Sequence, residues 1–448
     1  MTILREIADG AHEVARDTSA HTFTEVGRHV LDTTACIVSG ATHPLARPWL
    51  RLLRRVAGGG GRAGSQPLGA SGTWPLLTAI GIDATLAHVD EFDALHTRAG
   101  IAPAAVVVAP TLLLGATLGE SGDAVARAIV SGYQAMGETS LRFGGAALYS
   151  ERWWPTALFG AVGAAAASSE LLGLDAAGRG TALALAVTGL GGLLSDGELG
   201  HGHYLLCGMA AARGAWAALA AQAGLTASMR LLDGPAAVAL GRAPATQPSG
   251  RIHLTDTALK RWPCARPLHT ALTALEELRG DGHLVGVGTQ VEIALPTPLL
   301  NFVTTDPRPA GPVEAAASAA VVVAGSVAGR AEDPGWYREV ALHRLNCAQP
   351  SVRLTSTPAL DAAFPERWGA QVTVRSGAAS AVRAVMVAPG DPARPLSSGQ
   401  LLTKASRLTG LAEDQSVLSR LLDVARAPEI RTVRAGLDEA LTAERNAS

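Results

Sequence analysis

The sequence predicts a mainly α protein with a large all-helical domain, discontinuous in sequence, and a smaller α+β domain. Before Pro244, one apolar segment with helical periodicity follows another, with short connections between them. After Pro244, several stretches alternate apolar and polar residues and are rich in β-branched side chains, as strands are. Helical periodicity returns near the C-terminus. We therefore expect a first helical part at 1–250, an α+β domain at 251–393 and a helical segment at 394–448 that returns to the helical domain.

Five apolar segments of the first part are predicted as helices, because their apolar residues recur at helical spacing. They are FTEVGRHVLDTTACIVSG (23–40), WPLLTAIGIDATLAHVDEFDALH (74–96), PAAVVVAPTLLLGATLG (103–119), SGDAVARAIVSGYQAMGETSLRFG (121–144) and ALFGAVGAAAASSELLGL (157–174). Gly40 is expected to end the first of them. The glycine-rich stretch GGGGRAGSQPLGASGT (58–73) predicts a flexible loop.

The later part mixes strand and helix patterns. Strands are predicted in TQVEIALPTP (289–298), ALHRLN (341–346) and AQVTVRSGAASAVRAVMVAP (370–389). The segment VEAAASAAVVVAGSVAG (313–329) is too short for a membrane span and is expected to be a buried helix. Near the C-terminus, SSGQLLTKASRLTG (397–410) and DQSVLSRLLDVAR (414–426) are predicted helices.

Charge and cysteine content restrict the partners and the compartment. The 37 basic and 39 acidic residues give a formal charge of -2, which favours neither nucleic acid nor an anionic membrane surface. We therefore expect a small-molecule substrate and a second copy of the chain as partners. The four cysteines lack CxxC spacing, which argues against a zinc ribbon or a disulfide framework: Cys36, Cys207, Cys264 and Cys347. With no signal-peptide pattern at the N-terminus, the prediction is a cytoplasmic protein.

Titratable residues concentrate in LAHVDEFDALHTRAGIAPAAV (86–106). If the helix continues through this stretch, His88 and Glu91 share one stripe, and Asp93 and His96 share the neighbouring one. A carboxylate facing a partly buried cleft would have a shifted pKa and suit proton transfer. The alternative is an exposed helix end with ordinary ion pairs.

A second polar stretch is SDGELGHGHYLLCG (195–208), expected to be a loop ahead of an apolar helix. His203 there is a candidate general acid or base, because imidazole titrates near neutrality. Two alternatives stay open: a histidine that caps the following helix, and metal binding with Asp196 and Glu198. The metal alternative lacks a third ligand at a recognisable spacing, so we expect no metal.

The third stretch is LKRWPCARPLH (259–269), where Lys260 is followed by Arg261 and Arg266. Such a compact cationic site suits a substrate carboxylate, or an enolate as negative charge develops on it. The alternative is a solvated basic turn. A thiolate nucleophile at Cys264 is less favoured, because no base is adjacent in sequence.

The order of these segments resembles the MmgE/PrpD family of 2-methylcitrate dehydratases and cis-aconitate decarboxylases. The resemblance rests on HVDEFD, WWPTALFGAVGAAAASSELLGL, HYLLCGMAAARGAWAALAAQAGLT, LKRWPCARPLHTAL and ARPLSSGQLLTKASRLTG, in that order along most of the chain. It implies a discontinuous helical domain, a smaller α+β lid domain and a homodimer. It also implies chemistry on carboxylic acids in the cleft between the domains, without cofactor or metal.

Several positions depart from the family pattern, and most replace a polar group with an apolar one. Glu91 stands for an Asp, Leu95 for a Thr, Ala102 and Trp154 for two His, His203 for the first Lys and Val321 for a Tyr, while Lys260 matches the second Lys. The resemblance therefore implies a pocket less polar than one built for a tricarboxylate.

These observations predict a cofactor-independent lyase or isomerase of specialised metabolism that removes a proton α to a carbonyl of a bulkier, less charged acid. The candidate catalytic residues are His203, Lys260 and Glu91, which we expect around one cleft between the domains. Candidate substrate contacts are Asp93, His96, Trp153, Trp154, Tyr204 and Arg266. A cyclase or epimerase on the same scaffold, or a catalytically silent partner-binding relative, is the alternative.

Overall fold

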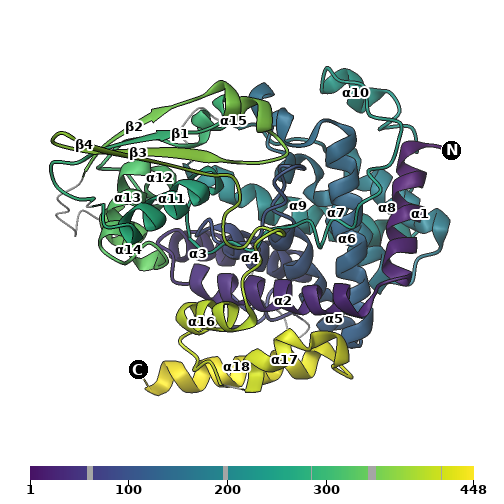
Figure 1. Cartoon of the computed structure of the whole chain (residues 1–448). Coiled ribbons are helices and arrows are strands. Elements are labelled where there is room, and N and C mark those ends of the chain that lie inside the picture. Colours follow the sequence, from purple (N-terminus) through teal and green to yellow (C-terminus); the bar gives the residue numbers. More distant parts are fainter. Residues whose placement is uncertain (58–63, 195–199, 284, 342–349, 415, 448) are drawn as a thin grey trace.

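The computed structural model describes residues 1–57, 64–194, 200–283, 285–341, 350–414 and 416–447 (Figure 1). The elements described in its first part are all helices. The elements are α1 (Ile3–Arg16), α2 (Ala20–Gly40), α3 (Ala46–Ala57), α4 (Leu76–His88), the π-helix η1 (Ala104–Val108), α5 (Ala109–Leu118), α6 (Gly122–Arg142), η2 (Gly145–Glu151), α7 (Pro155–Leu171), α8 (Ala176–Val187), α9 (Gly200–Gln222) and α10 (Pro235–Ala239).

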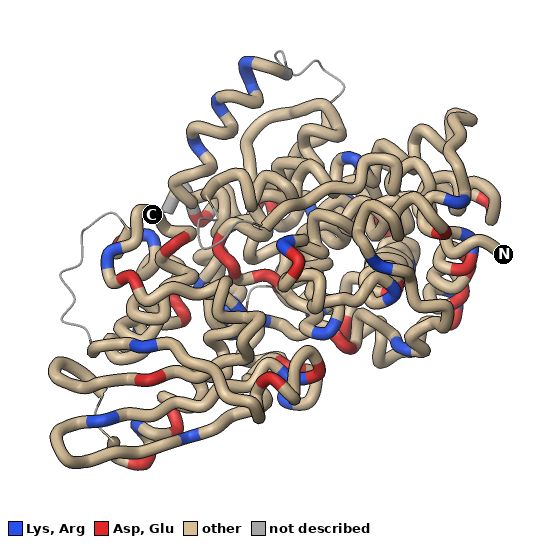
Figure 2. Tube along the Cα trace, turned by 90° about the horizontal axis from the view of Figure 1, so that it is seen from above, with Lys and Arg blue, Asp and Glu red and all other residues tan. Residues whose placement is uncertain are grey.

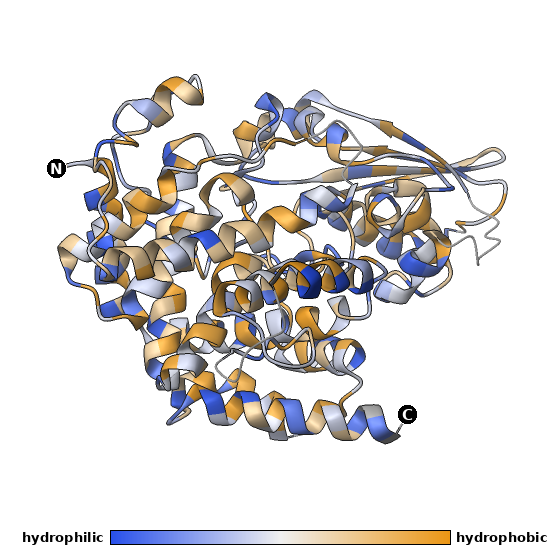
Figure 3. Ribbon diagram, turned by 180° about the vertical axis from the view of Figure 1, so that it is seen from behind, coloured by the Kyte–Doolittle hydropathy of each residue, from blue (hydrophilic) through white to orange (hydrophobic). Residues whose placement is uncertain are grey.

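Small side chains let the central helices approach closely. α7 packs against α6, α8 and α9, and α4 packs against α2 and α9. A Cβ added at Gly132 of α6 would lie 2.9 Å from the Gly163 carbonyl oxygen of α7, so neither helix tolerates a larger residue at this crossing. Figure 3 shows that the central helices are largely apolar. One of them, α9, is long and apolar enough to cross a membrane, but 56% of its apolar window is buried in the fold, as in a core helix.

The α+β domain carries a four-stranded sheet in the order β2-β1-β3-β4. β1 pairs with β2 in parallel and with β3 antiparallel, and β3 pairs antiparallel with β4. The helix α11 packs against β3 and β4. The elements are η3 (Arg266–Leu268), α11 (His269–Gly280), β1 (Gln290–Ala294), η4 (Thr297–Phe302), α12 (Pro312–Ala317), α13 (Ala319–Val327), α14 (Pro334–Ala341), β2 (Ser351–Thr355), α15 (Pro358–Ala363), β3 (Ala370–Ser376) and β4 (Ala379–Val385).

The C-terminal helices return to the helical domain, as Figure 1 shows below α2. α16 and α17 pack against α2, and α18 packs against α5. Their bounds are α16 (Ser398–Thr409), α17 (Ser416–Leu422), η5 (Val424–Arg426) and α18 (Ile430–Ala447). The buried apolar residues form two clusters. The first combines the N-terminal helices with Leu396–Leu441 and also takes in Leu299, Val313 and Trp368. The second consists of other residues between Trp262 and Val385.

The predicted fold class, a helical domain with a smaller α+β part, is confirmed. The helix predicted at 313–329 is divided at Ser318, whose extended backbone separates α12 from α13 and whose hydroxyl caps α13. The strand β2 was not predicted. Of the predicted strand ALHRLN, residues 342–346 lie outside the described residues, and so do residues 58–63 of the glycine-rich loop. The domain boundaries at 250 and 393 remain predictions.

Charged residues and cysteines are spread over the described part of the chain. Figure 2 shows basic and acidic residues mixed along the trace, although α3 carries arginines and no acid. Cys36, Cys207 and Cys264 are free and buried, and Cys347 lies outside the described residues.

Candidate active site

The polar stretch after α4 forms a turn, not a continued helix. α4 ends at His88, and Glu91 follows with a φ of 53°, a left-handed conformation that is uncommon outside glycine. Backbone carbonyls that would accept hydrogen bonds within a continued helix accept them from lysine side chains instead. Lys260 Nζ donates to the Glu91 carbonyl at 2.7 Å, and Lys404 Nζ donates to the Phe92 carbonyl at 2.9 Å. The prediction of a helix beyond His88, with two stripes along it, is therefore wrong.

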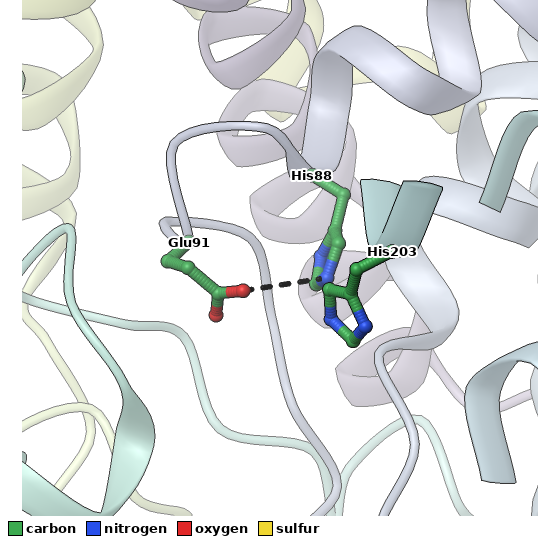
Figure 4. Close-up of side chains that lie close together, drawn as sticks. All are labelled: His88, Glu91 and His203. Carbon is green, nitrogen blue, oxygen red and sulfur yellow. Dashed lines mark ion pairs between the residues drawn. The ribbon is translucent and has the colours of Figure 1, made fainter. Parts of the chain in front are cut away.

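The turn places His88 between two carboxylates. His88 Nδ1 lies 2.8 Å from Asp93 Oδ1, and His88 Nε2 lies 3.7 Å from Glu91 Oε1. Nε2 is buried and has no hydrogen-bond partner among the described residues. Because Asp93 fixes the ring through Nδ1, Nε2 faces Glu91, as Figure 4 shows.

The chain contains two lysines, and both are buried beside this turn. Lys260 Nζ lies 3.2 Å from Glu91 Oε2 in addition to its bond to the Glu91 carbonyl. Lys404 Nζ donates to the Lys260 carbonyl at 2.9 Å and pairs with Asp32 at 2.6 Å. The two ammonium groups therefore hold the turn in place from inside the protein.

His203 reaches the same place from α9. His203 lies within the described range of this helix, Gly200–Gln222, so the prediction of a loop at His203 is wrong. The imidazole stacks on Trp154, with ring centroids 3.8 Å apart, and its centroid lies 5.8 Å from that of His88. Trp154 is itself fixed just before Pro155, the first residue of α7. Asp196 and Glu198, considered above as metal ligands, lie outside the described residues.

One cavity of about 60 Å³ collects these groups between the helical domain and the α+β domain. Its polar lining consists of His88, Glu91, Tyr149, His203, Lys260 and Arg266. Its apolar lining includes Leu95, Ala102, Trp154, Phe302, Val313 and Trp368. The expectation that Lys260, Glu91 and His203 meet in one place is confirmed.

A cavity of this volume holds a few waters, whereas ligand pockets usually measure about 300 to 1,000 Å³. We therefore expect the domains to separate when substrate binds.

Burial and neighbouring charges set the protonation of the cavity groups. Burial opposes ionisation of Glu91, but Lys260 and then His88 lower the pKa of Glu91 to about 2. Burial also opposes protonation of His88, but the carboxylates of Asp93 and Glu91 raise its pKa above the usual value. Burial and the charge on His88 lower the pKa of His203 to about 3. At neutral pH, Glu91 is thus ionised and His203 is a neutral imidazole.

The candidate substrate contacts separate into two groups. Trp154 and Arg266 line the cavity; Arg266 pairs with Asp391, and its Nη1 has no hydrogen-bond partner in the described part of the chain. Tyr204 packs behind the two imidazoles, with its ring centroid 5.5 Å from that of His88. Asp93 lies behind His88 and does not line the cavity.

Two further candidates lie away from the cavity. His96 points to an adjoining hollow of about 330 Å³ and lies 3.2 Å from His253, and Trp153 forms a backbone bridge with Leu193. Val321, expected to make the pocket less polar, lies in the second core cluster.

Two residues of the site were not among the sequence-based candidates, His88 and Lys404. The sequence held a signal for Lys404, because the chain has only two lysines and the other, Lys260, was already a candidate. In the structure the two lysines lie beside one another. His88 was not a candidate, because its role as a base depends on its contact with Asp93. That contact cannot form if the helix continues past His88, as the sequence analysis assumed.

The molecule is thus a mainly helical protein with a small cavity, lined by both polar and apolar side chains, between a helical domain and an α+β domain. Residues 5–246, more than half of the chain, match the MmgE/PrpD N-terminal domain. The protein therefore belongs to the MmgE/PrpD family, which consists generally of lyases of the dehydratase type. Among curated proteins, none matches this sequence.

Proposed function

We propose that this protein is a cofactor-independent lyase or isomerase that removes a proton α to a carbonyl group of a carboxylic-acid substrate. One observation supports it most: an imidazole backed by a carboxylate, His88–Asp93, and the ammonium group of Lys260 line the same interdomain cavity. The membership in a family of dehydratase-type lyases supports the same class of reaction.

His88 is the best-placed base. Asp93 fixes its ring through Nδ1 at 2.8 Å, and Nε2 has no hydrogen-bond partner in the described part of the chain. Against the effect of burial, the carboxylates of Asp93 and Glu91 raise the pKa of His88 above its usual value, which makes it a stronger base than the other two candidates. The other two candidates have pKa values of about 2, for Glu91, and about 3, for His203. In this proposal Asp93 keeps the His88 ring oriented, while Glu91 and His203 stay beside it as secondary proton carriers.

Lys260 is the electrostatic partner. An ammonium group has three N–H donors, and Lys260 uses two of them on the Glu91 carbonyl and side chain. The third is available for a substrate carboxylate or for the enolate oxygen that forms when the proton leaves. The unpaired Nη1 of Arg266 is a second anchor on the same cavity.

The substrate should carry few negative charges. Each cation of the cavity already faces a carboxylate, Lys260 with Glu91 and Arg266 with Asp391, so little positive charge is left uncompensated. The remaining walls are apolar. A tricarboxylate such as 2-methylcitrate would leave carboxylates without partners there, at a cost of roughly 1 to 3 kcal/mol or more for each.

After proton removal, two outcomes follow from the same enolate. A leaving group on the β carbon departs, which is elimination, or a proton returns to the other face, which is isomerisation. Both need the base and the ammonium group, so one experiment tests the common step.

The test is exchange of the α proton in D₂O, followed by ¹H NMR, over a panel of monocarboxylic and dicarboxylic hydroxy and keto acids. The native protein should exchange the α proton of at least one acid. His88→Gln should slow this exchange by about 10²-fold to 10⁴-fold, the usual contribution of a general base. His201→Ala is the matched control, because His201 lies in the same turn of α9 as His203 but is exposed. Exchange at the native rate in His88→Gln would contradict the proposed base.

A further inference from the structure

We propose that His88, Glu91 and His203 form a binding site for a divalent transition metal such as Zn²⁺. One ligand atom of each residue lies within 4.8 Å of the others. Figure 4 shows the two imidazoles side by side and the Glu91 carboxylate directed at them. Two histidines and one carboxylate are a recognised ligand set of zinc sites that keep a fourth position open.

His88 is arranged as a metal ligand usually is. Its Nδ1 lies at hydrogen-bond distance from the Asp93 carboxylate, 2.8 Å, which fixes the ring and leaves Nε2 free for a metal. Nε2 is buried and has no hydrogen-bond partner among the described residues, an arrangement that costs free energy unless something occupies the position. It lies 3.7 Å from Glu91 Oε1.

Glu91 can serve a metal and Lys260 together. Lys260 Nζ contacts Oε2 at 3.2 Å, whereas Oε1 is the oxygen on the His88 side. The carboxylate would then bridge the ammonium group and the metal ion. Because the Lys260 ammonium group and the metal ion would share one carboxylate and repel each other, Lys260 should weaken the affinity of the site for the metal.

His203 supplies the third ligand from a fixed position. The helix α9 and the stack on Trp154 hold its ring, so little side-chain entropy is lost when a metal binds.

A metal at this site would compete with the proposed reaction. It would occupy His88 Nε2, the atom to which the proton is transferred, so metal binding and turnover exclude each other. This consequence rests on the proposed function, whereas metal binding itself does not.

The test is a titration of the full-length protein, first freed of metal with EDTA and desalted, with ZnCl₂ against a chromogenic zinc chelator. We expect one zinc per chain in the native protein and in His201→Ala. His203→Phe keeps an aromatic ring against Trp154, and Glu91→Gln keeps the shape of the carboxylate. Each should weaken binding by at least the factor of about 10 to 100 that loss of an outer-shell partner costs.

Lys260→Met gives a result of opposite sign. It should tighten zinc binding, because the competing cation is removed, although it should abolish the proposed reaction. The visible absorption of bound Co²⁺ serves as a second measurement, since it reports histidine ligation directly, and circular dichroism verifies that each variant is folded.

Native affinity for zinc in His203→Phe, or no stoichiometric zinc in the native protein, would overturn the site. Proton exchange by the metal-free protein is measured separately, so failure of the metal site and failure of the proposed reaction are distinguishable.

Discussion

Lys404 Nζ donates a hydrogen bond to the backbone carbonyl of Lys260 at 2.9 Å, so the two lysines of the chain lie one behind the other. Lys260 lines the cavity, whereas Lys404 comes from α16 and pairs with Asp32 of α2 at 2.6 Å. Lys404 Nζ also lies 3.7 Å from the centre of the Phe92 ring. The C-terminal segment thus positions the cavity lysine without lining the cavity itself.

Lys404→Met should destabilise the protein strongly. The substitution keeps most of the side-chain volume but leaves the Asp32 carboxylate buried without its cation, and such a loss typically costs about 3 to 5 kcal/mol. The free energy of unfolding, measured with urea, gives the result. Arg420→Met on α17 is the control, because Arg420 is exposed. A loss below about 1 kcal/mol for Lys404→Met would mean that Asp32 is not held by this lysine.

The two lysines also allow a direct measurement of ligand binding. Protein labelled with [ε-¹³C]lysine should give two side-chain NMR signals, which Lys404→Arg assigns. A monocarboxylate that occupies the cavity should shift the Lys260 signal and leave the Lys404 signal nearly unchanged, because only Lys260 lines the cavity. Equal shifts of both signals would indicate a change of the whole fold, and no shift at any concentration would place the ligand elsewhere.

Most of the fold was predictable because helical periodicity is a local signal. The helices α2 and α5 to α7 lie where the apolar spacing placed them, and the alternation in 370–389 predicted strand structure where β3 and β4 lie. The strand β2, SVRLT, was missed, because its partner β1 pairs with it in parallel from far away in the sequence. Pairing of this kind leaves little local pattern.

The site was predictable in composition but not in geometry. Lys260, Glu91 and His203 meet as expected, but the arrangement depends on contacts between segments far apart in the sequence. Lys260 and Lys404 take the carbonyls of the turn after His88, and no local pattern reveals that these lysines end the helix. For the same reason the His88–Asp93 pair was missed, since two residues five apart face different sides of a helix.

Two copies of the chain should associate through the exposed face of α9. Met209 and Trp216 are 67% and 43% exposed and lie seven residues apart, so they share one face of the helix. Exposed apolar residues on one face are typical of an interface. Light scattering should give about twice the chain mass of 45.7 kDa. Met209→Asp combined with Trp216→Asp should give the monomer, whereas Val238→Asp, exposed on α10, should not. A native monomer at micromolar concentration would remove this prediction.

Stability should fall as the pH decreases below about 6.5, and His29 should account for part of the fall. Burial, followed by the charges of Arg28 and Lys404, lowers the pKa of His29 from 6.5 to about 3. Between these values the unfolded chain binds a proton that the folded protein does not, so the free energy of unfolding rises with pH by about 1.4 kcal/mol per unit for this one group. His29→Gln should therefore reduce the slope of stability against pH by that amount between about pH 4 and 6, measured by urea unfolding.

Tyr133→Phe removes the hydroxyl that lies 3.1 Å from His29 Nδ1, and burial raises the pKa of Tyr133 far above this range. It should lower stability equally at each pH and leave the slope unchanged, whereas an unchanged slope in His29→Gln would show that His29 is protonated in the folded protein.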